Sequence, residues 1–592
     1  MKITKKILIV TCLFSIFISC QNTIFKKEMV SKIDLEQGFQ NPPNQAKART
    51  WWHWISGNVS KSGITKDLEA MKAVGIQEAQ LFNVHLGFPT GPVKYLSEEW
   101  LDLFKFSAEE AKRLDLELAF HNSAGWSSSG GPWVKPEHAM QTVVFNEITV
   151  KGGKPIKQNL PKPKTKFEYY KDIALLAFPK PKQIQKIDGL DYKMLSERVR
   201  NHLLPDTKSI SKEAVISKET IINLTSKFSE EGVLTWDAPK GDWVILRLGH
   251  TPIGTTNRPA PPEAKGLEVD KMSKTAVDAY WEAGVQPIID KLGDLVGTTV
   301  NNCLIDSYEV ETTNWTDGFD VQFENLRGYE LTAYLPTLAG YYVESGEVSE
   351  RFLWDFRRTI GDLIAENYYG HFGELCHKNK LKFSVEPYWG PFDNMQVGAQ
   401  GDIVMCEFWS GGYPFFDSPK FVSSIAHLNG SSIVGAESFT GIGGWNDHPA
   451  QLKSIGDSAW AEGIGEVITP IKLAERWYVI VRPQCHVSTA EIFSDPQLTR
   501  DTSPITMSAF FAGAIRNDLQ QAVEANYPAV RKALNLLEKF SPAMMTGSGA
   551  CVFTALDNET SARQIAAAIE GQFETIVARG INTSPPIITH HN

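Results

Sequence analysis

Short apolar runs alternate with longer amphipathic stretches along the chain from residue 49 onward. The short runs are rich in β-branched and aromatic residues, which is typical of strands, and the stretches between them repeat apolar residues at helical spacing. Strands are predicted at Trp51–Ile55, Ile76–Val84, Leu116–His121, Val300–Asp306, Leu381–Glu386, Ile403–Phe408 and Ile433–Ser438. Helices are predicted at Gly63–Val74, Glu98–Leu114, Lys274–Lys291 and Ser349–Lys378. This alternation is typical of βα units in a parallel sheet or barrel, so the predicted fold class is α/β.

The alternation stops between residues 141 and 250. Lysine- and proline-rich turns separate short alternating runs there, and this pattern predicts an inserted β-domain. The predicted barrel consists of residues 41–140 and 251–460, with seven strands where a closed (β/α)8 barrel has eight. We therefore expect an incomplete barrel, truncated before its eighth strand. Its first and seventh strands should be unpaired with each other, or bridged by a foreign segment such as Trp477–Val481.

The first 20 residues predict a targeting segment. Lysines near the start precede the apolar run Ile7–Ser19, which is short for a bilayer span. Phe17-Ile18-Ser19-Cys20 resembles a bacterial lipoprotein box, which implies cleavage before Cys20 and lipidation of that residue. The alternative is an ordinary cleaved secretory signal. Either case predicts export, and the first predicts a lipid-anchored protein of the bacterial cell envelope that contacts the membrane only through its lipid.

Composition limits the partners of the chain. Its 592 residues carry a formal net charge of −10, and no cluster of basic residues follows the amino terminus, so nucleic-acid binding is not expected. The seven cysteines show no metal-ligand spacing and predict no disulfide framework.

Carboxylates lie at or near the ends of several predicted strands. They are Asp306, Glu309, Glu311, Glu386, Glu407 and Glu437, and aromatic residues surround them. Glycoside hydrolysis needs one carboxylic acid to protonate the leaving oxygen and one carboxylate to activate water or attack carbon. In a barrel, the carboxyl-terminal ends of the strands build the active site. The pattern therefore favours a sugar-cleaving site.

Several ordered motifs carry a resemblance to a known family. They are Trp51-Trp52-His53-Trp54, Asn122-Ser123-Ala124-Gly125-Trp126, Gly131-Pro132-Trp133-Val134, Asp306-Ser307-Tyr308-Glu309, Cys406-Glu407-Phe408-Trp409 and Ala436-Glu437-Ser438-Phe439-Thr440. From Asn41 to Asp457 the chain resembles the α-L-rhamnosidases of glycoside hydrolase family 106. The resemblance implies an inverting hydrolase on a (β/α)8 barrel, a rhamnose-containing glycan as substrate, a calcium ion near the sugar and lipoprotein export.

The resemblance also implies roles for individual residues. Glu309, Glu407 and Glu437 match the essential glutamates of the family; we assign Glu437 as general acid and Glu309 as general base, and place Glu407 on the metal or on sugar hydroxyls. Substrate-binding roles are expected for Asp306, His53, His121, Asn122, Trp126, Glu386 and Trp389. Calcium prefers several oxygen ligands, and no contiguous calcium loop is present, so the ligands, still open, would come from separate strand ends.

The chain departs from the family pattern near residues 456–466, and the following segment resembles a different family. From Ala461 to Pro585 it is similar to the carboxyl-terminal region of 4-diphosphocytidyl-2-C-methyl-D-erythritol kinase, an isoprenoid-pathway enzyme of the GHMP kinase superfamily. The glycine motif Thr546-Gly547-Ser548-Gly549 contributes to this likeness. The resemblance implies an α+β domain over residues 461–592. The apolar pattern of this segment predicts paired strands at Val479–Val481 and Ala550–Leu556 and amphipathic helices at Ala529–Lys539 and Thr560–Ala568.

Kinases of this class also need a phosphate-binding loop and a catalytic Asp/Lys pair, which the family carries in its amino-terminal half. The serine-rich stretch Ser127–Gly131 lacks the signature of that loop and already fits the rhamnosidase pattern, so no nucleotide binding is expected. Three functions remain open: an exported rhamnosidase-like hydrolase, a kinase whose own sequence begins near Ala461 after a gene fusion or assembly artefact, and a non-catalytic sugar-binding lipoprotein.

Overall fold

The computed structural model describes residues 41–196, 209–229, 231–410, 417–431, 433–441, 447–449, 451–453, 455–456, 459, 475–496, 498, 516–547 and 549–580. The predicted signal with Cys20, and also Ser548, lie outside these residues. The chain divides into two compact units, Met1–Glu466 and Val467–Asn592. Within the described ranges no helix has the length and apolar character needed to cross a bilayer.

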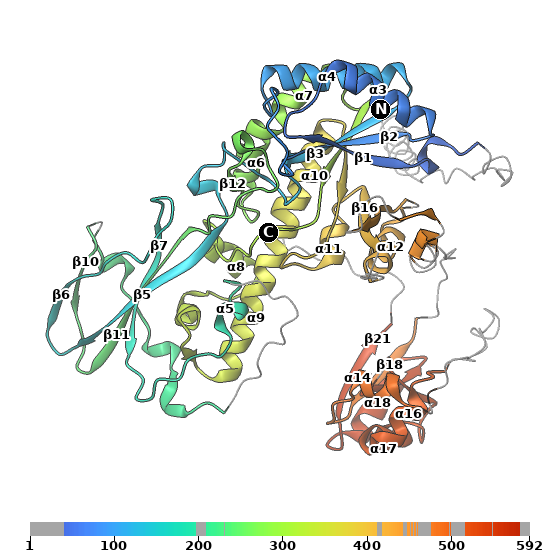
Figure 1. Cartoon of the computed structure of the whole chain (residues 1–592). Helices are drawn as coiled ribbons and strands as arrows, with labels where there is room; N and C mark the ends of the chain where they lie inside the picture. The colour runs from blue at the N-terminus through green and yellow to red at the C-terminus, as the bar shows by residue number, and fades with distance from the viewer. Residues whose placement is uncertain are drawn as a thin grey trace, which may run out of the picture. The chain divides into compact units, whose positions relative to one another are not determined.

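The first unit is built on a seven-stranded parallel sheet (Figure 1). In spatial order its strands are β1 (Arg49–Ile55), β2 (Glu78–Val84), β3 (Glu117–Ala124), β13 (Val300–Ile305), β15 (Lys382–Val385), β16 (Ile403–Ser410) and β17 (Gly435–Gly441). All seven strands coincide with predicted ones. In the described part of the chain β1 and β17 pair with one neighbour each and not with one another, so the incomplete barrel is confirmed.

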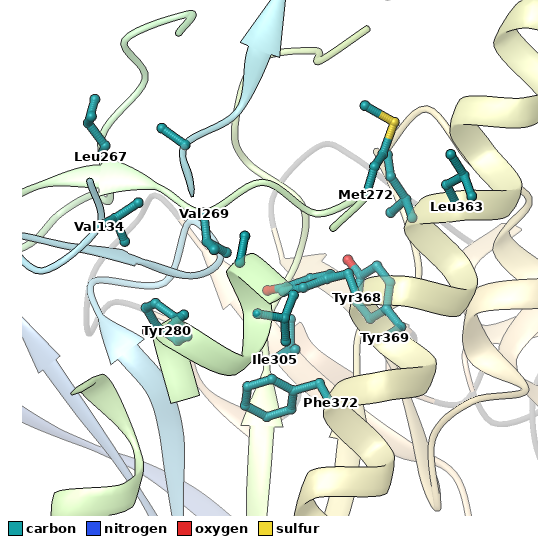
Figure 2. Packing of buried hydrophobic residues seen from close by; sticks show 14 of the residues in the cluster. Val134, Leu267, Val269, Met272, Tyr280, Ile305, Leu363, Tyr368, Tyr369 and Phe372 are labelled. Carbon is teal, nitrogen blue, oxygen red and sulfur yellow. The ribbon is translucent and has the colours of Figure 1, made fainter. Parts of the chain in front are cut away.

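Alternation along the strands separates an outer face from an inner face. Outer side chains such as Trp54, Phe120 and Ile305 join the large core against the helices that cover the sheet. Figure 2 shows Ile305 of β13 among Tyr280, Tyr368 and Phe372. The helices of this unit include α3 (Lys61–Ala73), α4 (Glu98–Arg113), α6 (Lys274–Gly284), α7 (Gln286–Leu292), α9 (Gly346–Leu363), α10 (His371–Lys378) and α12 (Asp417–Asn429).

Two of the helix predictions need correction. The predicted helix Lys274–Lys291 is interrupted between α6 and α7, and Pro287 lies at the start of α7. Proline has no backbone N–H and is tolerated in the first turn of a helix but not inside one, so the break falls just before it. The predicted helix Ser349–Lys378 passes through a π-helical segment, Ile364–Gly370, between α9 and α10. Apolar spacing detects the helical stretch but not this change of pitch.

The inserted β-domain is antiparallel. Its main sheet has the order β5 (Gln141–Lys151), β11 (Asp242–Pro252), β7 (Lys171–Pro179) and β9 (Ile222–Asn223), and β6 (Pro155–Asn159) pairs with β10 (Val233–Asp237). The base of β5 is fastened to the barrel, because Gln141 N donates to Thr313 Oγ1 (3.2 Å) and Val143 N donates to Asn314 Oδ1 (2.7 Å). Short elements complete the unit: β4 (Gly130–Gly131), β8 (Val215–Ile216), β12 (Leu267–Glu268), β14 (Tyr342–Val343), α5 (Leu190–Lys193), α8 (Phe319–Arg327) and α11 (Asn394–Gly398).

The second unit has its own antiparallel sheet and core. The strand order is β19 (Ala543–Met545), β20 (Val552–Leu556), β18 (Trp477–Arg482) and β21 (Glu574–Arg579). The helices are α14 (Thr489–Ser494), α16 (Gln520–Asn526), α17 (Pro528–Leu537) and α18 (Glu559–Ile569). The predicted pairing of Val479–Val481 with the strand after the glycine motif is confirmed, and β18 pairs with β20 and β21. The predicted helices correspond to α17 and α18.

Candidate active site

The inner face of the parallel sheet gathers carboxylates at the carboxyl ends of four strands. Leu304 of β13 and Met405 of β16 belong to the inner apolar cluster, and side chains two residues apart on a strand share a face. Asp306 and Glu407 therefore also face inward. In the β16–β17 ladder Glu407 is the register partner of Glu437, which places these two glutamates side by side. Glu386 follows β15, the strand between β13 and β16.

Asp306, Glu386 and Glu437 form the tightest group. Their nearest oxygen atoms all lie within 4.8 Å of one another. Tyr388 Oη donates to Glu386 Oε2 (2.6 Å), Ser307 N donates to Asp306 Oδ1 (2.6 Å), and Thr440 Oγ1 donates to Glu437 Oε1. In the described structure Asp306 Oδ2 and Glu386 Oε1 are buried with no partner of ordinary hydrogen-bond geometry. These two oxygens are therefore the least satisfied polar atoms of the group, and their mutual repulsion favours protonation.

Burial controls the protonation of these groups. Burial is the largest cause that raises the pKa of Asp306, to about 6. Burial also raises the pKa of Glu386 well above its usual range, and the charges of Asp306 and Glu437 raise it further. Burial, then the charge of Asp306, raises the pKa of Glu437 to about 8, and burial raises that of Glu407 to about 7. Because the carboxyl groups interact, these pKa values describe the cluster as a whole. At neutral pH part of the cluster is protonated.

Glu309 approaches the same group from the loop after β13. Its charge contributes to raising the pKa values of Asp306, Glu407 and Glu437, so its carboxylate lies close enough to interact with all three. Its backbone N donates to Ser127 O (3.1 Å), and its side chain is half-buried. The site thus combines the buried carboxyl groups of Asp306, Glu386 and Glu407 with the half-buried ones of Glu309 and Glu437.

Aromatic side chains and histidines line the β1–β3 side of the inner face. Phe82 stacks on His121 (centroids 4.9 Å apart) and also contacts His53 (5.6 Å), which in turn contacts Trp126 (6.4 Å). Burial lowers the pKa of His121 to about 4, so His121 is neutral at pH 7. On the other side Trp389 has a left-handed backbone (φ 68°) and is 38% exposed. Its exposed indole suits contact with a sugar face.

Asn122 occupies a different position from the other predicted site residues. Its side chain is fully buried, and Nδ2 donates to Ser129 Oγ. Strand alternation places it on the opposite face of β3 from His121, so its contact is with the Ser127–Gly131 loop and not with the carboxylates. Sequence alone could not show which of the two adjacent polar residues faces inward, because β3 is buried throughout.

A buried ion pair that the sequence pattern did not predict holds this loop. Lys271 Nζ lies 2.9 Å from Glu268 Oε2, and both side chains are 0% exposed. Ser127 Oγ donates to Glu268 Oε1 and Ser129 N donates to Glu268 Oε2, both at 3.0 Å. The Ser127–Gly131 loop, which superficially resembles a phosphate-binding loop, is therefore held by the carboxylate of Glu268. The sequence gives little signal for this pair, because Glu268 and Lys271 lie in a stretch that also contains Lys265, Asp270 and Lys274.

The glycine motif of the second unit forms a closed turn after β19. Thr546 N donates to Cys551 O and Gly549 N donates to Thr546 O, both at 2.9 Å. Asn517 Nδ2 donates to Gly547 O (2.7 Å), and both glycines of the motif have positive φ (47° and 99°). Two backbone hydrogen bonds and one from the side chain of Asn517 therefore hold the described part of this turn.

Comparison with known proteins agrees with this division of the chain. The sequence model of the α-L-rhamnosidase family matches residues 40–189 and 182–473. The chain belongs to glycoside hydrolase family 106. A protein of Formosa agariphila named "Putative beta-glucuronidase" is 76% identical over 456 residues, which is 77% of this chain and 39% of that protein. The solved structure of a rhamnosidase from Novosphingobium sp. PP1Y is 31% identical, with a TM-score of 0.64, and the match covers 73% of this chain and 56% of that one.

The second unit matches a different family. Residues 507–575 match the sequence model of the carboxyl-terminal domain of GHMP kinases. A 4-diphosphocytidyl-2-C-methyl-D-erythritol kinase of Pseudomonas syringae is 50% identical over 129 residues, which is 22% of this chain and 46% of that protein. This chain spans less than half the length of either curated relative. The first unit of the chain is thus a family 106 glycoside hydrolase fold, and the second contains a GHMP kinase carboxyl-terminal domain.

Proposed function

We propose that the first unit cleaves terminal α-L-rhamnose from a glycan by an inverting mechanism. One observation carries the proposal. Glu407 on β16 and Glu437 on β17 are register partners, and Glu309, in the loop after β13, interacts with both. Two carboxyl groups, one protonated and one ionised, are what hydrolysis of a glycosidic bond needs.

Glu437 acts as the general acid in this proposal. It donates its proton to the glycosidic oxygen while the bond from that oxygen to the anomeric carbon breaks. Glu309 accepts a proton from the water that attacks the anomeric carbon from the opposite face, so the product has inverted configuration. In this proposal Glu407 binds sugar hydroxyls, and the indole rings of Trp126 and Trp389 contact the sugar ring and orient it.

We further propose a calcium site at Asp306 and Glu386. The fit rests on Asp306 Oδ2 and Glu386 Oε1, which are buried without ordinary hydrogen-bond partners in the described structure. Calcium prefers such carboxylate oxygens and would neutralise their mutual repulsion. Glu437 belongs to the same tight group, whereas Glu407, the ligand expected from the resemblance, does not. Bound calcium would stabilise negative charge and could coordinate sugar hydroxyls.

Hydrolysis of an aryl α-L-rhamnoside by the full chain tests the proposed function. Rhamnose released first as the β-anomer, followed by nuclear magnetic resonance, is the expected result; the α-anomer would contradict inversion. The matching aryl β-D-glucuronide tests the activity in the name of the Formosa relative, and should not be cleaved. Binding of rhamnosides without hydrolysis would instead favour the non-catalytic sugar-binding protein.

Calcium can be assessed separately from turnover. We expect Asp306→Asn to weaken calcium binding measured by calorimetric titration, whereas Glu437→Gln should lower turnover and retain calcium. Equal loss of calcium in both variants would place Glu437 on the metal and remove it as the general acid.

We also propose that the chain is exported and anchored by a lipid on Cys20. The support is the basic and apolar start of the sequence followed by Phe17-Ile18-Ser19-Cys20. Metabolic labelling with a radioactive fatty acid in a bacterial host should mark the wild-type chain and not Cys20→Ala. Equal labelling of both would contradict the assignment.

A further inference from the structure

Arg258 is fixed at the rim of the carboxylate cluster by its own backbone and side chain. Its N–H donates to Ser127 Oγ (2.9 Å), and its carbonyl oxygen accepts from the N–H groups of Trp126 and Ser127 (3.0 Å each). One guanidinium nitrogen, Nη2, donates to the carbonyl oxygen of Glu309. Arg258 thus contacts the backbone of Trp126 on one side and the backbone of Glu309, the proposed general base, on the other.

The neighbouring glycine shows how tightly this segment is packed. Gly125 has φ +80°, and a Cβ at that position would lie 2.6 Å from both C and O of Arg258. The two loops therefore approach each other at backbone distance. This close approach fixes the base of the Arg258 side chain before any ligand arrives, which lowers the entropy that binding would cost.

The charge of Arg258 has no carboxylate partner in the described structure. The side chain is exposed, and no ion pair within 4.0 Å includes it, although buried cations such as Lys271 and Arg247 are each paired with a carboxylate. A guanidinium has five N–H donors, and the bond to Glu309 O engages only one of its nitrogen atoms. An edge of the group remains for another acceptor.

We infer that Arg258 binds the carboxylate of an acidic sugar unit next to the bond that is cut, and so makes the enzyme selective for glycans in which rhamnose is attached to a uronic acid. The inference rests on the proposed hydrolase function and specifies its substrate class. Five carboxyl groups, those of Asp306, Glu309, Glu386, Glu407 and Glu437, surround the proposed reaction site, and those that are ionised repel a negatively charged glycan. A fixed guanidinium at the rim offsets that repulsion, and its planar edge matches a carboxylate through two parallel hydrogen bonds. A neutral glycan gains nothing from this charge.

The experiment compares two disaccharides that differ only in the acidic group. One is rhamnosyl-glucuronic acid, and the other is its carboxyl-reduced counterpart, rhamnosyl-glucose. The full chain is assayed as wild type, Arg258→Gln and Arg258→Lys, and kcat and KM are measured for both substrates. Arg351→Gln is the control, because it removes another exposed arginine charge, on α9, where Arg351 is 78% exposed and pairs with Glu347.

We expect the wild type to prefer the acidic disaccharide by about tenfold or more in kcat/KM. A charge-assisted hydrogen bond contributes roughly 1.5–3 kcal/mol, so Arg258→Gln should reduce that preference by about 10- to 100-fold, mainly through KM. Arg258→Lys should keep part of the preference, because it keeps the charge and loses the planar edge. Arg351→Gln should leave the preference unchanged.

Other results would overturn the inference. Equal cleavage of both disaccharides by the wild type would show that no acidic sugar is recognised. An equal fall of kcat on both substrates in Arg258→Gln would make Arg258 a positioning residue for Glu309. A sulfated sugar that competes as strongly as glucuronate would show selection of anions in general.

The inference can fail separately from the proposed function. If no rhamnoside is cleaved, calorimetric titration of the wild type and Arg258→Gln with rhamnosyl-glucuronic acid measures recognition alone. Binding that weakens tenfold or more in the variant supports the inference even then, and equal binding or its absence in both overturns it.

Discussion

The Lys271→Met substitution tests how strongly the first unit depends on the ion pair beneath the Ser127–Gly131 loop. Lys271 and Glu268 are both 0% exposed and 2.9 Å apart, and Lys271 also lies over the ring of Tyr368 at 5.3 Å. Methionine fills similar volume but leaves the Glu268 carboxylate buried without its counter-charge. Glu268 would keep only the hydrogen bonds from Ser127 and Ser129.

The expected cost is about 3–5 kcal/mol of the free energy of unfolding, which is the range for breaking a buried pair by removing one partner. The pair itself attracts by roughly 6 kcal/mol at an effective dielectric constant of about 20, and the two remaining hydrogen bonds offset part of the loss. Lys193→Met is the matched control: Lys193 is 3% exposed and 2.6 Å from Glu350, but Glu350 is 23% exposed and can be hydrated. That variant should lose only about 1 kcal/mol.

Urea unfolding followed by tryptophan fluorescence reports mainly on the first unit, because Trp477 is the one tryptophan after residue 466. The double variant Glu268→Gln/Lys271→Met, which removes both charges, should recover more than half of the loss. The reasoning would be refuted if Lys271→Met lowered the urea midpoint no more than Lys193→Met does. Because Glu309 N donates to Ser127 O, turnover at urea concentrations where the variant is folded should also fall.

The remaining predictions concern catalysis, acid stability, loop packing and the second unit. Glu437→Gln and Glu309→Gln should each lower kcat by at least about a hundredfold, the scale of acid–base catalysis, and a near-wild-type rate would remove that residue from the mechanism. Burial lowers the pKa of His250 to about 4 from 6.5. The unfolded chain therefore takes up this proton first, and up to about 3 kcal/mol of stability is lost as pH falls from ~6.5 to ~4. His250→Asn should have a correspondingly flatter dependence of its urea midpoint on pH. Gly125→Ala should be destabilising, because its Cβ would meet the backbone of Arg258 at 2.6 Å; an unchanged midpoint would contradict this contact. Titration of the full chain with ATP and magnesium should show no saturable heat at micromolar ATP, and saturable binding would revive the kinase interpretation.

The sequence was sufficient to predict the strands of the barrel, because each overlaps a short apolar or aromatic run between helical stretches. It also indicated the carboxylates, since Asp306, Glu386, Glu407 and Glu437 all follow or end such runs. Parallel strands bring their carboxyl ends to one edge, so residues distant along the chain meet there by topology alone. The closest grouping, of Asp306 and Glu386 with Glu437, was not predictable, because it depends on register and side-chain geometry.

The sequence pattern also could not predict the Glu268–Lys271 ion pair that holds the Ser127–Gly131 loop. Glu268 and Lys271 are charged residues, and charged residues are rarely fully buried unless they are paired. Their burial depends on Ser127 and Ser129, which lie some 140 residues earlier in the chain and approach Glu268 only in the folded state. No local periodicity encodes such a long-range contact. The same holds for Arg258, whose role depends on its contact with Glu309.

The concentration of acidic groups explains why the site needs this rigid support. Burial raises the pKa values of Asp306, Glu386, Glu407 and Glu437, so keeping them together opposes folding whenever they are ionised. Protons or a cation would neutralise part of the cluster, and a rigid surrounding backbone would keep the remaining charges from moving apart. The Glu268–Lys271 pair and the close approach of Gly125 to Arg258 provide that restraint on the loop side. A glycan with its own carboxylate would increase the repulsion unless a guanidinium met it at the rim, and for this reason the position of Arg258 bears on substrate choice more than on catalysis.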